Sequence, residues 1–245
     1  MPRFKLTIEY DGTPYAGWQR QKDVPSVQEE IEKAVEKFSQ QRTTLHCAGR
    51  TDAGVHALAQ VAHIDIDTTC SAFTVSEALN HFLHDKKIAI VACEQTDNTF
   101  HARFCAKKRY YEYHIINRRA PLALEGNRAW HVKQTLDVGA MQQGAKYFLG
   151  THDFTSFRDS DCQAKSPIKT IDAIHIERQD HYIIIVLEAL SFLHHQVRIM
   201  TGSLVGVGRG KYSPDHIQKM LTAKCRTKSG MTAPAQGLFF IGVEY

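Results

Sequence analysis

The chain has 245 residues, of which 43% are hydrophobic and 23% are charged, and its formal net charge is +4. This composition is that of a globular protein with a sizeable core, and the length suits one large domain or two ordinary ones. No apolar run approaches the roughly 18 residues that a membrane-spanning helix needs, and no secretory signal stands at the N-terminus. A cytoplasmic protein without a membrane partner is expected.

The first hundred residues are predicted to fold in the order strand, helix, strand, strand, helix, strand. Apolar and polar residues alternate over 4–10, which is the period of a half-buried strand. Ser26, with a glutamate three residues later, forms a capping box ahead of a helix over 26–39, and Thr74 is predicted to cap a second helix in the same way. The remaining strands are predicted at 44–48, 59–66 and 88–93.

The same order recurs in part along the second half of the chain. Strands are predicted at 108–117, on both sides of Gln179-Asp180 within 172–188, and at 238–244, and helices at 135–149, 194–207 and 214–223. This order is that of the ferredoxin-like split βαβ unit, an antiparallel sheet with both helices on one face. We predict an α+β protein of two tandem ferredoxin-like domains, 1–105 and 106–245, whose sheets meet at a central active-site cleft.

The sequence contains no motif for a metal or a nucleotide cofactor. The glycine-rich stretch 202–211 departs from a phosphate-binding loop at Val205 and Tyr212. The six cysteines include no C-x-x-C pair, which predicts reduced thiols and no structural zinc. His194 and His195 are adjacent, and neighbouring side chains on a helix point in different directions. We expect neither a metal nor a cofactor.

Positive charge is concentrated in two stretches of the sequence. Residues 102–119 carry six basic side chains against one acidic, and residues 198–228 carry seven against one, whereas the remainder of the chain has a net charge of −7. The first stretch also contains aromatic residues. Two solvated faces would produce such runs, but segregation on this scale also indicates a nucleic-acid partner.

A charged turn separates the second and third predicted strands. Gly49 and Gly54 enclose Arg50 and Asp52 there, and glycine lets the backbone bend sharply and approach a ligand closely. One interpretation is a plain connecting turn that the Asp52 carboxylate stabilises. The other is a turn that presents a reactive carboxylate.

The octapeptide Gly49–His56 resembles the signature of the tRNA pseudouridine synthase A family. Other segments resemble further family blocks in the expected order, and together they span almost the whole chain: Tyr10-Asp11-Gly12-Thr13, Gly17-Trp18-Gln19, Ser26-Val27-Gln28, Phe100-His101-Ala102-Arg103-Phe104, Arg109-x-Tyr111-x-Tyr113, Phe192-Leu193-x-His195-x-Val197-Arg198 and Ala233-Pro234-x-x-Gly237-Leu238. The resemblance implies two ferredoxin-like domains that isomerise uridine to pseudouridine in the tRNA anticodon stem-loop, at positions 38, 39 and 40.

The resemblance also implies roles for three catalytic residues. Asp52 matches the catalytic aspartate, whose carboxylate would attack C1′ of the ribose, add to the uracil ring, or abstract the 2′ proton. Arg198 matches the basic residue that pairs with this aspartate and keeps it ionised. Tyr111 matches the tyrosine that packs on the target base, whereas Tyr113, on the same strand face, is predicted to belong to the core. The isomerisation needs no cofactor, because it involves no redox change and no group transfer.

RNA-binding residues follow from the same resemblance and from the charge pattern. Arg50 resembles the arginine that enters the RNA stack when the target uridine is turned outward. Phosphate contacts are predicted for basic residues of the first charged stretch, namely Lys107, Lys108, Arg109, Arg118 and Arg119. The expected partner is the anticodon stem-loop of tRNA, and the resemblance implies a homodimer.

Two other functions compete with an RNA-modifying isomerase. A non-catalytic RNA-binding protein would use the same two sheets, but it would gain nothing from a carboxylate that faces phosphates. A nucleoside hydrolase would need a second carboxylate as general acid, and the sequence offers no evident partner for Asp52. The isomerase remains the leading hypothesis.

Overall fold

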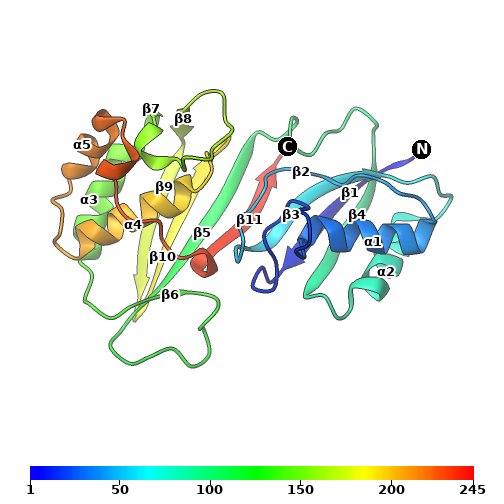
Figure 1. Ribbon diagram of the computed structural model, residues 1–245, viewed down its shortest axis with the longest axis horizontal. Coiled ribbons are helices and arrows are strands. Elements are labelled where there is room, and N and C mark those ends of the chain that lie inside the picture. Colours follow the sequence, from blue (N-terminus) through cyan, green and yellow to red (C-terminus); the bar gives the residue numbers. More distant parts are fainter. The chain divides into compact units, whose positions relative to one another are not determined.

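The computed structural model describes all 245 residues and divides into two compact units (Figure 1). The first unit comprises Met1–Lys107 and Phe239–Tyr245, and the second comprises Lys108–Leu238. Both combine helices with mostly antiparallel strands, which confirms the predicted α+β class. None of the helices has the length and apolar character needed to cross a membrane.

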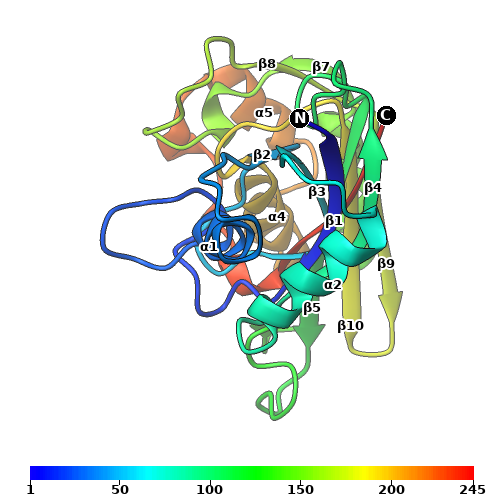
Figure 2. The ribbon, with the colours of Figure 1, turned by 90° about the vertical axis from the view of Figure 1, so that its right-hand side faces the viewer.

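The first unit follows the predicted order of strands and helices. Its elements are β1 (Arg3–Tyr10), α1 (Val27–Ser39), β2 (His46–Cys47), β3 (His56–Asp65), α2 (Ala72–Leu83), β4 (Ile88–Thr96) and most of β11 (Leu238–Glu244). The strands β4, β1, β3 and β2 lie side by side in that order, each antiparallel to the next. β11 pairs with β3 in parallel. The two helices contact each other on one face of this sheet (Figure 2).

Local sequence explains where the helices of the first unit begin. Ser26 caps α1, and its hydroxyl accepts a hydrogen bond from the Glu29 backbone N–H at 3.3 Å, which confirms the predicted cap. The predicted cap of α2 is wrong. Ser71, not Thr74, caps that helix, because its hydroxyl accepts the Thr74 N–H at 3.2 Å and thereby places Thr74 inside the first turn.

A group of histidines connects β2 and β3 to the segment that follows β4. His46 and His63 are cross-strand partners whose ring centroids lie 5.1 Å apart, and the His101 ring lies 4.6 Å from that of His63. His63 is only 2% exposed, and its Nδ1 accepts a hydrogen bond from the Ala102 backbone N–H at 3.1 Å. His63 therefore serves the fold as a neutral acceptor.

His63 makes the stability of the protein depend on pH. Burial, with repulsion from His101, Arg3 and His46, lowers its pKa from 6.5 to about 4. Between these values the unfolded chain binds a proton that the folded chain does not. The free energy of unfolding should therefore fall as the pH drops from 6.5 towards 4, by up to about 3 kcal/mol. Urea unfolding across this range should show a smaller fall for His63→Asn, which keeps an acceptor but does not titrate.

The second unit also combines a main sheet with helices. Its elements are β5 (Lys108–Asn117), β6 (Trp130–Val132), α3 (Val138–Ala145), β7 (Gly150–Asp153), β8 (Ile168–Ile171), β9 (Ala173–Gln179), β10 (Tyr182–Ala189), α4 (Gln196–Gly208) and α5 (His216–Ala223). β5, β10 and β9 lie side by side and antiparallel, β6 pairs with β5 in parallel, and β7 and β8 form a separate pair. The predicted hairpin at Gln179-Asp180 is confirmed, whereas α5 begins two residues later than predicted.

The glycine-rich stretch belongs to α4 and the turn that ends it. Every residue of α4 is buried except Arg198. A Cβ atom at Gly202 would lie 1.9 Å from the Met231 carbonyl oxygen, so this glycine allows a backbone segment to pack directly on the helix. The stretch is thus a packing surface and not a phosphate-binding loop.

Candidate active site

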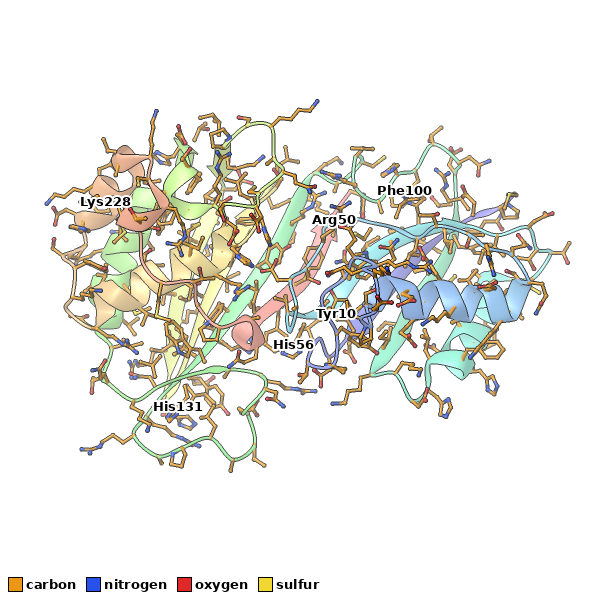
Figure 3. All side chains as sticks on the ribbon, viewed as in Figure 1. Tyr10, Arg50, His56, Phe100, His131 and Lys228 are labelled. Carbon is orange, nitrogen blue, oxygen red and sulfur yellow. The ribbon has the colours of Figure 1, made fainter.

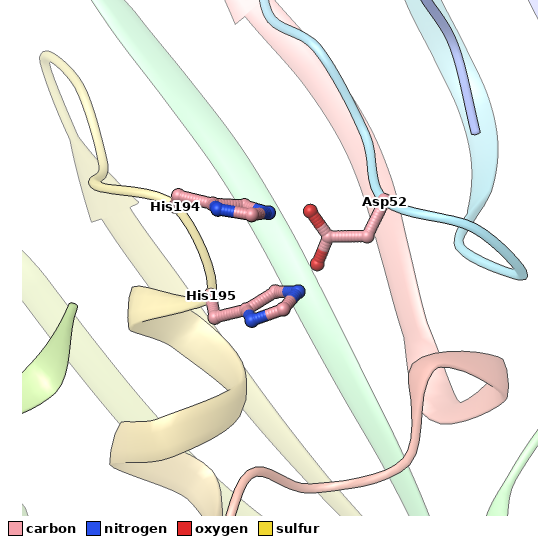
Figure 4. A group of neighbouring side chains, drawn as sticks. All are labelled: Asp52, His194 and His195. Carbon is pink, nitrogen blue, oxygen red and sulfur yellow. The ribbon is translucent and has the colours of Figure 1, made fainter. Parts of the chain in front are cut away.

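The loop between β2 and β3 carries Asp52 on a tight turn. The Val55 backbone N–H donates to the Asp52 carbonyl oxygen at 3.2 Å, and Gly54 has the left-handed φ of 77° that such a turn needs at its third position. Thr51 and Val55 are buried, whereas Asp52 is half-buried. The Asp52 side chain extends away from the loop (Figure 4). The turn therefore presents a carboxylate on a fixed backbone.

The residue before Asp52 is held by the last residue of β1 and by the segment that follows this strand. The hydroxyl groups of Tyr10 and Thr51 are hydrogen-bonded at 2.7 Å, and the Trp18 backbone N–H donates to the Thr51 carbonyl at 3.0 Å. Trp18 is 1% exposed, and its ring packs 5.9 Å from that of Tyr10. Burial raises the pKa of Tyr10, so its hydroxyl stays protonated. One side of the turn is thereby anchored to the core of the first unit.

The other side of the turn is held by His56. Its Nδ1 accepts the Gly12 backbone N–H at 3.1 Å, and Asp11 Oδ1 lies 3.3 Å from the same nitrogen. Burial disfavours the charge on Asp11, but hydrogen bonds from Thr13 and from the Lys87 ammonium outweigh it and lower its pKa to about 2. Tyr10 and His56 thus hold the turn from two strands (Figure 3).

Arg50 lies at the start of the same loop, and its side chain is exposed (Figure 3). Burial raises the pKa of the neighbouring Cys47 thiol to about 12, and the positive charge of Arg50 opposes this rise. The structure brings Arg50 and Asp52 together on one turn, as their spacing of two residues predicts.

In the second unit, β5 directs two tyrosines to the same face. Tyr111 is 7% exposed, and its ring meets that of Phe192 edge-on at 5.2 Å. Tyr113 is fully buried, and its hydroxyl donates to the Pro234 carbonyl at 2.6 Å, which confirms its predicted place in the core. Residues two positions apart in a strand point to the same face, which accounts for the common orientation of the two tyrosines.

Arg198 lies in the first turn of α4 and is held by a carbonyl group. Its Nε donates to the Ala233 carbonyl oxygen at 2.8 Å, and the Ala233 N–H donates back to the Arg198 carbonyl at 3.0 Å. Burial raises the pKa of Tyr113, and the charge of Arg198 opposes that shift. Within the second unit the structure therefore places Arg198 close to the tyrosine-bearing face of β5.

A pair of residues ahead of α4 was not predicted. His195 adopts a left-handed φ of 60° at the N-terminal cap, and its Nδ1 lies 2.6 Å from Asp159 Oδ2. A hydrogen bond from the Asp161 N–H, together with His195, lowers the pKa of Asp159 to about 2. Neither the spacing of 36 residues nor any periodicity marks this contact in the sequence.

The expectation that His194 and His195 point in different directions is wrong. Their ring centroids lie 4.0 Å apart, and Figure 4 shows the two rings side by side. The expectation assumed helical geometry, but α4 begins only at Gln196 and the backbone of His195 is left-handed.

The predicted phosphate contacts differ in how accessible they are. Lys107 and Arg119 are exposed, whereas Lys108 is half-buried with its Nζ 3.2 Å from Glu188 Oε2. Arg118 is half-buried, and one of its Nη atoms donates to the Pro121 carbonyl at 3.1 Å. Arg109 is 7% exposed and donates to the Leu190 carbonyl oxygen.

Comparison with known proteins identifies the family. Residues 6–105 and 145–245 match the family described as tRNA pseudouridine synthase. The chain belongs to this tRNA pseudouridine synthase family. It is therefore an isomerase, and the predicted resemblance is confirmed.

Relatives named "tRNA pseudouridine synthase A" match the chain along its full length. The protein of Paramagnetospirillum magneticum is 57% identical over 100% of this chain and 96% of its own. Those of Ehrlichia chaffeensis and Brucella anthropi are 52% and 51% identical, over 99% and 100% of this chain and 100% and 98% of theirs. Asp52 and Arg198 lie inside the two segments that match the family. Tyr111 lies in the stretch between these segments, which the match to the Paramagnetospirillum magneticum protein includes.

Proposed function

We propose that this tRNA pseudouridine synthase family member isomerises uridine at positions 38, 39 and 40 of the tRNA anticodon stem-loop, with Asp52 as the catalytic residue. The observation that carries the proposal is the fixed turn of Asp52. Hydrogen bonds with Tyr10 and Trp18 hold it on one side, and a hydrogen bond with Gly12 holds it on the other. A turn fixed in this way keeps a carboxylate in position for a reaction, whereas a mere connection between strands does not need it.

The reaction breaks the bond from C1′ to N1 of uridine, turns the freed uracil, joins C5 to C1′ and transfers the C5 proton to solvent, while N1 gains a proton. It needs an ionised carboxylate beside the sugar and a surface that holds the free base. In this proposal Asp52 supplies the carboxylate. Arg198 keeps the role that the family resemblance implies, which is to favour the ionised form of the aspartate.

Tyr111 is proposed to pack on the uracil ring and to assist removal of the C5 proton. Tyr111→Phe keeps the ring but loses the hydroxyl, so we expect tRNA affinity to persist and the single-turnover rate to fall about 100-fold, as for loss of a general base. The single-turnover rate of the variant, measured at concentrations well above the Kd for tRNA, tests this expectation. An unchanged rate would leave the ring as the only contribution of this residue.

Arg50 is proposed to occupy the RNA stack after the target uridine has turned outward. Its side chain is exposed two residues before Asp52, so a planar cation and the reactive carboxylate stand on the same turn. C1′ and C5 of a stacked uridine are hidden, which makes this displacement necessary.

Phosphate contacts are proposed for the basic residues of 107–119. Lys107 and Lys108 allow an exposed side chain to be compared with one that is paired to a carboxylate. Lys107→Ala should weaken tRNA binding and reduce the slope of log Kd against log salt concentration by about one unit. Lys108→Ala should change the slope less, because Glu188 already neutralises its ammonium group. Filter binding at several salt concentrations measures both slopes. Equal changes would mean that the Glu188 pair opens when RNA binds.

We further propose that the protein consists of two ferredoxin-like domains, 1–105 and 106–245, and that it is a cytoplasmic homodimer. The order β4, β1, β3, β2 in the first unit and the placement of α1 and α2 on one face are those of the ferredoxin-like fold. The proposed dimer rests on the family resemblance.

Release of tritium from tRNA labelled at C5 of uridine tests the proposed function directly. We expect release that depends on the protein and on uridine at positions 38, 39 and 40. Binding of tRNA without release would instead identify a non-catalytic RNA-binding protein, the competing function.

A further inference from the structure

We propose that the turn formed by residues 101–105 is a second RNA-binding site, where an unstacked base of the RNA stacks on Phe104 and the adjoining phosphate contacts Arg103. The proposal rests on the proposed function, because it takes RNA as the substrate of this protein.

The first observation is the exposure of Phe104. This phenylalanine is 76% exposed, although burial of such a ring would stabilise the fold. The His101 ring lies 4.3 Å from it, and the Arg103 guanidinium carbon lies 5.8 Å from its centroid. Phe104 is therefore a largely exposed ring, with a second ring and a cation beside it.

The second observation is that the backbone of this turn is fixed. Ala102 is fully buried, its N–H donates to His63 Nδ1 at 3.1 Å, and its carbonyl accepts the Tyr245 hydroxyl at 2.9 Å. The Cys105 N–H closes the turn on the His101 carbonyl at 2.9 Å. Phe104 is thus displayed on a rigid support, and little entropy would be lost when a base stacks on it.

The third observation is the charge around the ring. Residues 101–108 include three basic side chains and no acidic one. The positive charges of Arg50 and Arg103 both oppose the rise in the pKa of the half-buried Cys47 thiol. Phe104 is thus next in sequence to a cation that acts on the same thiol as Arg50, the residue proposed to enter the RNA stack.

An open hollow of about 360 Å³ adjoins this turn and is lined in part by His46, His63 and His101. Burial lowers the pKa of His101, which favours its neutral form and leaves a flat aromatic ring beside the hollow. An aromatic ring, arginines and an adjoining hollow are the features with which proteins hold unpaired nucleotides.

Replacement of Phe104 tests the proposal by affinity. Phe104→Ala should weaken tRNA binding about tenfold, the effect of losing one stacked base. Phe104→Trp should restore the affinity, because it keeps an aromatic face. Phe73→Ala is the matched control, since Phe73 is 73% exposed in α2, and it should bind like the wild type. Equal affinities of Phe104→Ala and the wild type would overturn the proposal, as would an equal loss in the Phe73 variant.

The Phe104→Trp variant also gives a signal that does not depend on activity. The native tryptophans, Trp18 and Trp130, are 1% and 8% exposed, so the added indole supplies the exposed fluorescence. Stacking should quench it when tRNA or an anticodon stem-loop RNA is added. Absence of quenching, with pseudouridine formation intact, would refute this site alone, whereas failure of the wild type to bind or modify tRNA would refute the proposed function.

Discussion

Asp52→Asn is expected to abolish pseudouridine formation while tRNA binding survives. The substitution removes the negative charge but keeps the shape of the side chain, and the bond that closes the turn uses the backbone of Asp52 and Val55. The chemical step should slow by at least about 1,000-fold, because no other group in the turn offers a carboxylate. Single-turnover assays and filter binding of the same preparation measure the two quantities.

A matched control for this experiment is Asp23→Asn. Asp23 is exposed in another loop of the first unit with a φ of 62°, a conformation that asparagine tolerates. It should retain full activity. Substantial product from Asp52→Asn would contradict the catalytic role, and a parallel loss of binding, activity and thermal stability would favour a structural role in the turn.

Gly17→Ala is expected to destabilise the protein and to reduce activity at least about 100-fold without touching a proposed catalytic group. Gly17 has a φ of 101°, and a Cβ atom there would lie 2.7 Å from the Thr51 carbonyl oxygen and 3.1 Å from the Ala53 nitrogen. The methyl group would therefore push the turn that carries Asp52 out of position. The strained φ alone costs about 1–3 kcal/mol, and the clash adds to it.

Gly210→Ala is the control for a substitution at a glycine with positive φ that causes no steric clash. Gly210 has a φ of 71°, and a Cβ atom there would meet nothing within 4 Å, so this variant suffers a backbone strain smaller than that at Gly17 and no clash. Urea unfolding of both variants should show the greater loss for Gly17→Ala, and only that variant should lose activity. Equal losses of stability would mean that the Asp52 turn yields easily to the added methyl group.

Helices and strands were predictable where the pattern of apolar and polar residues extends over enough positions to define a period. The strands at 108–117 and 238–244 have the predicted bounds, because their alternation or apolar character extends over many residues. The strands β6, β7 and β8 were missed, since three or four residues do not establish a period. Ser71 was overlooked as a cap because no glutamate follows it at the third position.

In the candidate site, too, local patterns were visible in the sequence and long-range contacts were not. Asp52 and Arg50 stand in a local motif, and the family resemblance assigns Tyr111, which the period of the strand places on the same face as Tyr113. The bonds from Tyr10 and Trp18 to Thr51 join residues more than 30 positions apart, and so does the pair of His195 and Asp159. Such contacts depend on the tertiary fold, which no local pattern encodes.

The double anchoring of the Asp52 turn has a consequence for its dynamics. Because Thr51 and His56 are bonded to the end of β1 and to the segment after it, the turn cannot open without disrupting the core around Trp18. The loss of conformational freedom in this loop occurs during folding and not when RNA arrives. The amide protons of Trp18 and Val55 should consequently exchange with solvent as slowly as those of the central strands, even before tRNA is present.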